Sequence, residues 1–224
     1  MPGMEVWEIT GFTIATAALA TLLMLPPGLF LAWLLARRRF HGRALVDTAI
    51  SLPLVMPPVA TGLVLLALVA PRGPLGGLLQ RAGVDIVFTW RAVVLAMTVM
   101  GLPLLVRTAR AGIEQVDRRY EAAAATLGAG PIRVFFTVTL PLARPAVMAG
   151  AVLGFARALG EFGATIMIAG SIPGSTRTLA VAIYSFAETG RDRDAAMLVG
   201  VSAVIAFIAL AVSNWIVSRE SAHT

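Results

Sequence analysis

Residues 117–141 read DRRYEAAAATLGAGPIRVFFTVTLP and lie between two long apolar stretches of the chain. Asp117 can cap the start of a helix, and the four alanines of 122–125 are strong helix formers with little bulk. Gly128 can adopt the left-handed conformation that ends a helix, and Pro131 suits the first position of the next helix. Residues 132–138 also have strand propensity, but a lone strand would lack a pairing partner. We therefore expect a helix, a turn and a second helical element, together called the elbow.

The rest of the chain is strongly apolar. Of its 224 residues, 58% are hydrophobic and 13% are charged, against roughly 25% charged residues in soluble domains. Apolar blocks of about 20 residues are long enough to cross a bilayer as helices. The sequence therefore predicts an all-α, polytopic membrane bundle, one domain over 1–224 with its core at about 10–217. We expect five transmembrane helices, at about 12–36, 46–70, 92–110, 144–169 and 195–217.

Arginine residues are distributed unequally between the two sides of these predicted spans. Eleven arginines lie in the loop at 37–43, in the segment 107–144 and in the C-terminal tail, against six in the other loops. The positive-inside rule then places the N-terminus outside and the C-terminus in the cytoplasm. The elbow is expected on the cytoplasmic side of a plasma (inner) membrane, as a coupling element that receives force.

Several residue types are missing from the chain. It contains no cysteine, no lysine and only two histidines, His41 and His223. These absences argue against a metal centre, a cofactor bound through lysine and a P-loop, whose lysine grips nucleotide phosphates. We expect no catalytic residue, no metal and no cofactor, and any nucleotide chemistry would lie on another chain. The net charge of +6 is carried at span ends, which does not favour nucleic acid as a partner.

Two charges, Arg157 and Glu161, lie within the fourth predicted span. Charges in a membrane helix are costly and normally face the interior in pairs. Residues four apart share one helical face, so the two can pair directly. Two interpretations stay open: a structural ion pair, or an arginine that meets a passing anion. Gly160 and Gly163 would allow neighbouring helices to approach closely.

The elbow resembles the coupling loop of ABC transporter permease subunits of the binding-protein-dependent, type I importer class. That pattern reads Glu-Ala-Ala, three residues, Gly, nine residues, an aliphatic residue, one residue and Leu-Pro. With Gly128 as its glycine, the triplet falls on Ala122, Ala123 and Ala124, and its end on Leu140 and Pro141. Ala122 stands where the family has glutamate, and Glu121 lies one position early, so any pairing of that acid with an ATPase would be shifted or lost. The resemblance implies two ATP-binding subunits as partners.

A second stretch narrows the resemblance within this family. The run Gly160-Glu161-Phe162-Gly163-Ala164-Thr165 is similar to permeases of oxyanion importers, and Pro-Gly-x-Thr-Arg-Thr-Leu, which includes Arg177, resembles molybdate permeases. The resemblance implies a molybdate importer with an extracytoplasmic molybdate-binding protein and a pathway formed with a second copy of the chain.

Other interpretations remain open at this stage. Within the class, the alternatives are a sulfate/thiosulfate or tungstate permease. Outside the class, the alternative is a secondary transporter or channel, which would work without an ATPase and would be favoured by more intramembrane acids than Glu161.

Overall fold

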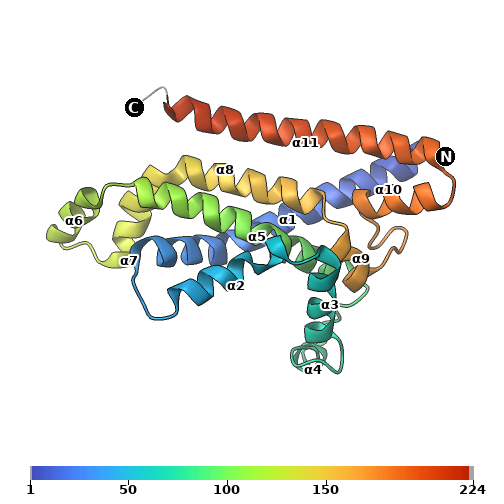
Figure 1. Cartoon of the computed structure of the whole chain (residues 1–224), viewed down its shortest axis with the longest axis horizontal. Helices are drawn as coiled ribbons and strands as arrows, with labels where there is room; N and C mark the ends of the chain where they lie inside the picture. Colours follow the sequence, from blue (N-terminus) through green and yellow to red (C-terminus); the bar gives the residue numbers. More distant parts are fainter. Residues whose placement is uncertain (1, 222–224) are drawn as a thin grey trace.

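The computed structural model describes residues 2–221, with side-chain surroundings for residues 5–215, and all of the elements in that part are helical. Met1 and residues 222–224, which the predicted domain includes, lie outside the described residues. The bundle is built on three long helices, α1 (Pro2–Arg37), α5 (Trp90–Gln115) and α8 (Leu140–Leu159), with α5 packed against both of the others. The fourth long helix, α11 (Asp192–Ser221), runs along α8 on the outside of the bundle (Figure 1).

Close packing between α5 and α8 depends on small residues. A Cβ added to Gly112 would lie 2.1 Å from Cβ of Ala146, and one added to Gly101 would lie 2.9 Å from the carbonyl oxygen of Gly154. Such contacts let helix backbones approach closely, which is how helices associate where lipid removes the ordinary hydrophobic driving force. The same region buries Met97 and Met100 against α9 (Gly163–Ala169).

In the part of the chain that the structure describes, four helices are long and apolar enough to cross a membrane: Glu5–Arg37, Trp90–Gln115, Pro131–Leu159 and Asp192–Trp215. The predicted span 46–70 is not one helix. It consists of α2 (Arg43–Val55) and α3 (Pro58–Val69), and the chain bends by 117° between the two helices. Met56 and Pro57 both have extended backbones, because a residue before proline is pushed out of the helical region. Pro57 and Pro58 therefore break the predicted span into two helices.

The predicted span 144–169 is also wrong as a single helix. The helix begins earlier, with α7 (Pro131–Val134), continues through a π-helical turn at Phe135–Thr139, and ends in α8 at Leu159. A break at 160–162 separates it from α9. Gly163 lies at the contact with α3, where a Cβ would come within 2.7 Å of Pro58. Gly160 has open space around it, so the expectation that it allows close helix packing is not met.

The remaining short helices lie at the ends and side of the bundle. Figure 1 shows α6 (Arg118–Thr126) and α7 at one end, where α11 also finishes, while α1 begins at the opposite end beside α10 (Leu179–Glu188). α3 and α4 (Gly76–Arg81) project from the side of the bundle (Figure 1).

Candidate functional site

The elbow has the local structure that its sequence predicts. The carboxylate of Asp117 accepts a hydrogen bond from the backbone N–H of Arg119 at 2.9 Å and caps α6. Gly128 has a φ of 86°, and Pro131 occupies the start of α7. Residues 132–138 are helical rather than extended. The helix–turn–helix form follows from these local signals alone.

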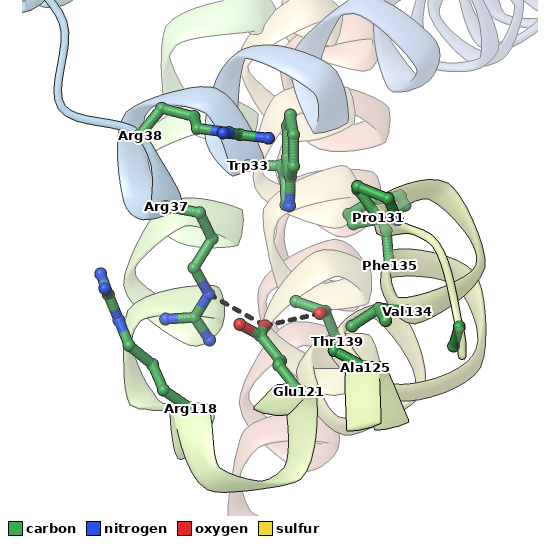
Figure 2. Close-up of a pocket in the computed structure, with 11 residues that line it drawn as sticks. Trp33, Arg37, Arg38, Arg118, Glu121, Ala125, Pro131, Val134, Phe135 and Thr139 are labelled. Carbon is green, nitrogen blue, oxygen red and sulfur yellow. Dashed lines mark hydrogen bonds and ion pairs between the residues drawn. The ribbon is translucent and has the colours of Figure 1, made fainter. Parts of the chain in front are cut away.

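Glu121 anchors the elbow to the bundle. Its Oε1 atom accepts hydrogen bonds from Nε of Arg37 at 2.9 Å and from Oγ1 of Thr139 at 2.6 Å (Figure 2). Arg37 also donates to the backbone carbonyl of Val116 at 2.8 Å. The side chains of Arg37 and Glu121 are 8% and 18% exposed. The acid that stands one position early in the family pattern therefore points into its own chain, and it links α1, the entry to α6 and the π-helical turn.

A pocket of about 320 Å³ lies beside this anchor, and Trp33 and Phe135 form its apolar part (Figure 2). The two rings meet edge to face with centroids 6.1 Å apart, and the guanidinium of Arg38 lies 5.5 Å from the Trp33 ring centre. The π-helical turn positions Phe135 and Thr139 toward α1. π-Bulges are frequent at functional sites, and this one carries a hydroxyl that fixes the elbow.

The outer face of the elbow remains exposed. Leu127 is 89% exposed, Ile132 77% and Tyr120 61%, while Ala122 and Ala123 are exposed and Ala124 is half-buried. We call Tyr120, Ala123, Leu127, Gly128 and Ile132 the elbow surface. Exposed apolar side chains gathered at one turn are typical of an interaction site.

Leu140 and Pro141, the last residues of the family pattern, lie at the start of α8 rather than on the elbow surface. Leu140 packs against the buried cluster that includes Leu35 and Ile113. Their place in the structure is at the junction between the π-helical turn and the bundle.

Arg157 and Glu161 form the ion pair that their spacing predicts. Nη1 of Arg157 lies 2.7 Å from Oε2 of Glu161, although the angles do not meet hydrogen-bond criteria. The other carboxylate oxygen accepts the backbone N–H of Ala164 at 2.7 Å, so Glu161 also caps α9. The Glu161 side chain is 1% exposed. These contacts favour the structural interpretation of the pair, because both oxygens already have partners at the break between α8 and α9.

The other residues of the oxyanion-family run surround the same break. Phe162 contacts the ring of Tyr184 with centroids 5.0 Å apart, and Gly163, Ala164 and Thr165 are buried against α3. Arg177, by contrast, contacts Glu5 and Ser171 at the end of the bundle where α1 begins, at 3.6 Å and 3.2 Å.

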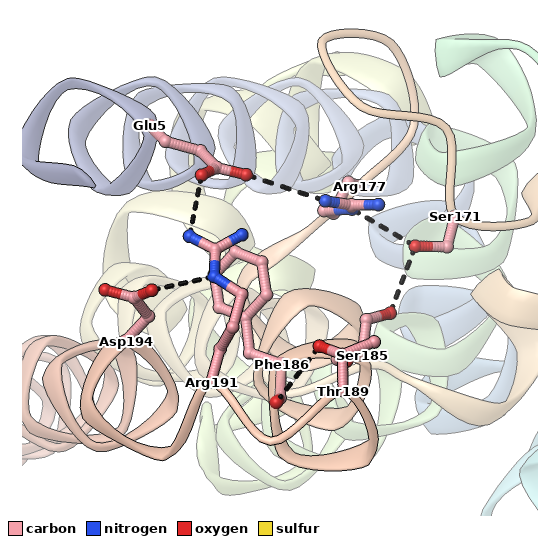
Figure 3. Close-up of polar contacts among 8 residues, drawn as sticks. All are labelled: Glu5, Ser171, Arg177, Ser185, Phe186, Thr189, Arg191 and Asp194. Atoms are coloured by element: carbon pink, nitrogen blue, oxygen red, sulfur yellow. Dashed lines mark hydrogen bonds and ion pairs between the residues drawn. The ribbon is translucent and has the colours of Figure 1, made fainter. Parts of the chain in front are cut away.

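The Arg177 contacts belong to a network that sequence reasoning missed. Glu5 also pairs with Nη2 of Arg191 at 3.0 Å, and Arg191 with Asp194 at 2.8 Å (Figure 3). Both guanidinium groups lie near the ring of Phe186, at 5.8 Å for Arg177 and 4.0 Å for Arg191. Hydrogen bonding to Glu5 and then to Asp194 raises the pKa of Arg191 above its ordinary value. We call Glu5, Arg177, Phe186, Arg191 and Asp194 the outer network.

A second polar feature absent from the sequence predictions is a groove between α2 and α5. It has a volume of about 330 Å³, and its lining residues are Asp47, Thr48, Ser51, Leu52, Val55 and Arg107. We call it the α2–α5 groove. Its sequence signal is present, because Asp47, Thr48 and Ser51 interrupt an apolar stretch at helical spacing. The partners of Asp47 and Ser51 on α5, however, lie 63 and 56 residues away in sequence.

Comparison with known proteins identifies the class. Residues 28–218 match the family described as binding-protein-dependent transport system inner membrane component, so the chain belongs to this family of membrane-embedded transport permeases. It is 47% identical over 220 residues to the molybdenum transport system permease protein ModB of Escherichia coli K12, covering 96% of each chain.

The chain is also similar to a sulfate permease in sequence and to a chain of a solved ABC transporter in fold. The chain is 40% identical over 157 residues to the sulfate transport system permease protein CysT of Salmonella typhimurium, covering 70% of this chain and 57% of CysT. A bacterial alginate ABC transporter, solved with a periplasmic protein bound to an alginate pentasaccharide, contains a chain of similar fold. The TM-score is 0.70 at 18% identity, covering 95% of this chain and 78% of that one.

Proposed function

We propose that the chain is the membrane-spanning permease subunit of an ATP-driven molybdate importer. The observation that carries this proposal is the similarity to the molybdenum permease ModB over 96% of both chains. The Pro173-Gly174-x-Thr176-Arg177-Thr178-Leu179 segment, which resembles molybdate permeases, supports the same substrate.

The arrangement of the helices supports an N-terminus outside and a C-terminus in the cytoplasm. α1 begins at one end of the bundle, and α11 finishes toward the other end, which carries the elbow (Figure 1). Opposite ends imply an odd number of crossings, so we propose that the bent pair of α2 and α3 returns the chain across the membrane as a fifth, broken span. A broken span is tolerated where protein covers its free backbone groups, and α9 packs on α3 at this place.

The elbow surface is the proposed docking site for the ATPase. Its apolar side chains are exposed at the end of the bundle that carries the arginine-rich loop. Movement of α6 would pass to α1 through the Arg37–Glu121 pair and to α8 through Thr139. Glu121 is thus assigned to the side of the elbow that faces the bundle, and the alanines and Gly128 to the side that faces the ATPase.

The proposed assembly follows from the family. Its members are inner membrane components of binding-protein-dependent systems, which supports an extracytoplasmic binding protein and separate ATP-binding subunits as partners. Because each chain has one elbow, two copies are proposed to form the pathway and to engage an ATPase pair. In this assignment the chain has no nucleotide site, metal or cofactor of its own and no nucleic acid partner.

Uptake of labelled molybdate into proteoliposomes that contain the whole complex tests the function. ATP-dependent and binding-protein-dependent uptake that resists a large excess of sulfate is expected. Uptake that continues without the ATPase would indicate a secondary transporter or channel.

The second candidate is a sulfate/thiosulfate permease, favoured by the 40% identity to CysT. Equal inhibition of molybdate uptake by sulfate would support this alternative. Tungstate has the same tetrahedral shape and charge as molybdate, so competition by tungstate is measured in parallel to define the range of oxyanions.

A further inference from the structure

We propose that the α2–α5 groove is an anion-binding station on the inward part of the pathway, where Arg107, Ser51 and Thr48 hold a tetrahedral oxyanion. This inference rests on the proposed function, since it assumes that an oxyanion crosses the bundle. Its volume of about 330 Å³ exceeds the roughly 30 Å³ that one water molecule occupies, so the groove has room for an oxyanion with part of its hydration shell.

Charge is the first argument. Within residues 5–215, Arg107 donates a hydrogen bond from Nη2 to Oγ of Ser51 at 3.0 Å, and no carboxylate pairs with it. Two less exposed arginines are neutralised: on α5, Arg110 lies 2.9 Å from Asp47 and 2.8 Å from Glu114, and on α8, Arg157 pairs with Glu161. Charges in membrane helices are normally paired, whereas Arg107 is exposed in the groove and keeps donors for another ligand.

The chemistry of the lining is the second argument. A guanidinium group presents a planar fork of N–H donors that matches an oxyanion, and the hydroxyls of Ser51 and Thr48 add donors from α2. Asp47 also lines the groove, but its Oδ2 atom is engaged by Arg110. Arg110 also pairs with Glu114, which lies 3.7 Å from Arg43, so the two acids are matched by Arg110 and Arg43 and the charge of Arg107 is left over.

Position is the third argument. Arg107 lies about 12 Å along the axis of α5 from the end that leads into the elbow. On α2, the polar lining residues precede Leu52 and Val55, which lie next to the break with α3. An ion that passes the break would meet the apolar part of the groove first and the arginine and hydroxyls next. A single cation in an exposed groove binds weakly enough for release.

Site-directed thiol labelling tests the groove directly, because the chain has no cysteine of its own. A Leu52→Cys variant is assembled with its ATPase and labelled with a neutral maleimide in nucleotide-free conditions, with molybdate or sulfate added over a range of concentrations. We expect the oxyanion to slow labelling of this position. A Leu78→Cys variant on α4, where the side chain is 63% exposed, should label at the same rate with and without the anion.

Arg107→Gln in the Leu52→Cys background should raise the oxyanion concentration needed to slow labelling by about tenfold or more. This is the loss of affinity expected for one charge-assisted hydrogen bond. Arg107→Lys should retain part of the protection. Arg144→Gln is the matched control, since it removes an exposed arginine at the start of α8 on the same side of the bundle.

The proposed anion site would be contradicted if neither molybdate nor sulfate slowed labelling of Leu52→Cys. It would also be contradicted if the anion slowed labelling equally well in the Arg107→Gln background. If the complex transports molybdate but the anion does not slow labelling of Leu52→Cys, the groove is not an anion site and the proposed function still holds. Protection by sulfate alone, together with sulfate-inhibited uptake, would keep the station and replace molybdate as the substrate.

Discussion

The two ends of the bundle are built in opposite ways. At the elbow end, Leu127 and Ile132 are exposed, and one ion pair, Arg37–Glu121, holds the exposed turn to the bundle. At the other end, Glu5 and Asp194 neutralise two arginines above Phe186, which is buried. One end therefore offers an exposed apolar surface tied to the bundle through Arg37 and Glu121, whereas the other is closed by several contacts among its own residues. We propose that a partner docks at the elbow end and that the outer network holds α1, α10 and α11 together.

Breaking the anchor should have the largest effect. Arg37→Gln leaves Glu121 with only the Thr139 hydroxyl, and removing one partner of a buried ion pair costs roughly 3–5 kcal/mol, reduced here because Glu121 is 18% exposed. We expect ATP-driven uptake to fall by more than about tenfold. Uptake is measured with the amount of complex assembled. Arg119→Gln, at a side chain 93% exposed, is the control, and unchanged uptake in Arg37→Gln would contradict the anchoring role.

A change of the elbow turn should have the next largest effect. Gly128 has a φ of 86°, where a β-branched residue is strained by about 1–3 kcal/mol. No atom lies within 4 Å of an added Cβ, so Gly128→Val should insert normally but couple poorly. Gly130, with a φ of −69° and open space, provides the control Gly130→Ala. Equal uptake by the two variants would separate Gly128 from coupling.

The outer network should respond least to a single change. Glu5→Gln removes the carboxylate shared by Arg177 and Arg191, but these groups are partly exposed, and exposed pairs contribute about 0–1 kcal/mol. We expect a small fall in the melting temperature of the complex and uptake within about threefold of normal. A loss of uptake as large as that of Arg37→Gln would show that transport depends equally on both ends. This result would contradict the contrast drawn between the two ends.

Local signals in the sequence were sufficient for the elbow and insufficient for its contacts. Asp117, Gly128 and Pro131 each act through their own backbone or nearest neighbours, so their roles are readable from the sequence. The partner of Glu121 lies 84 residues away on α1, and only the packing of α1 against α5 and α8 brings it there. The partners of Glu5 and Arg107 could not be predicted either, because they also lie far away in the sequence.

Helix breaks were predicted less well than helix ends. The predicted span 46–70 contains three prolines, and Pro57 and Pro58 interrupt its helix, whereas Pro53 remains inside α2. The break after α8 depends on Glu161, whose carboxylate caps α9 instead of continuing the helix. In the sequence that residue is visible only as a charge four positions from Arg157.

Recovery of the ATPase subunit with a Leu127→Asp permease tests most directly whether the elbow surface is the docking site. Leu127 is 89% exposed, so the substitution should leave insertion and folding unchanged, as surface changes usually alter stability within about 0.5 kcal/mol. Leu127→Met keeps the apolar surface and is the control. Normal amounts of permease with a large loss of co-purified ATPase are expected for Leu127→Asp alone. Full recovery of the ATPase, together with normal uptake, would contradict the docking role of the elbow surface.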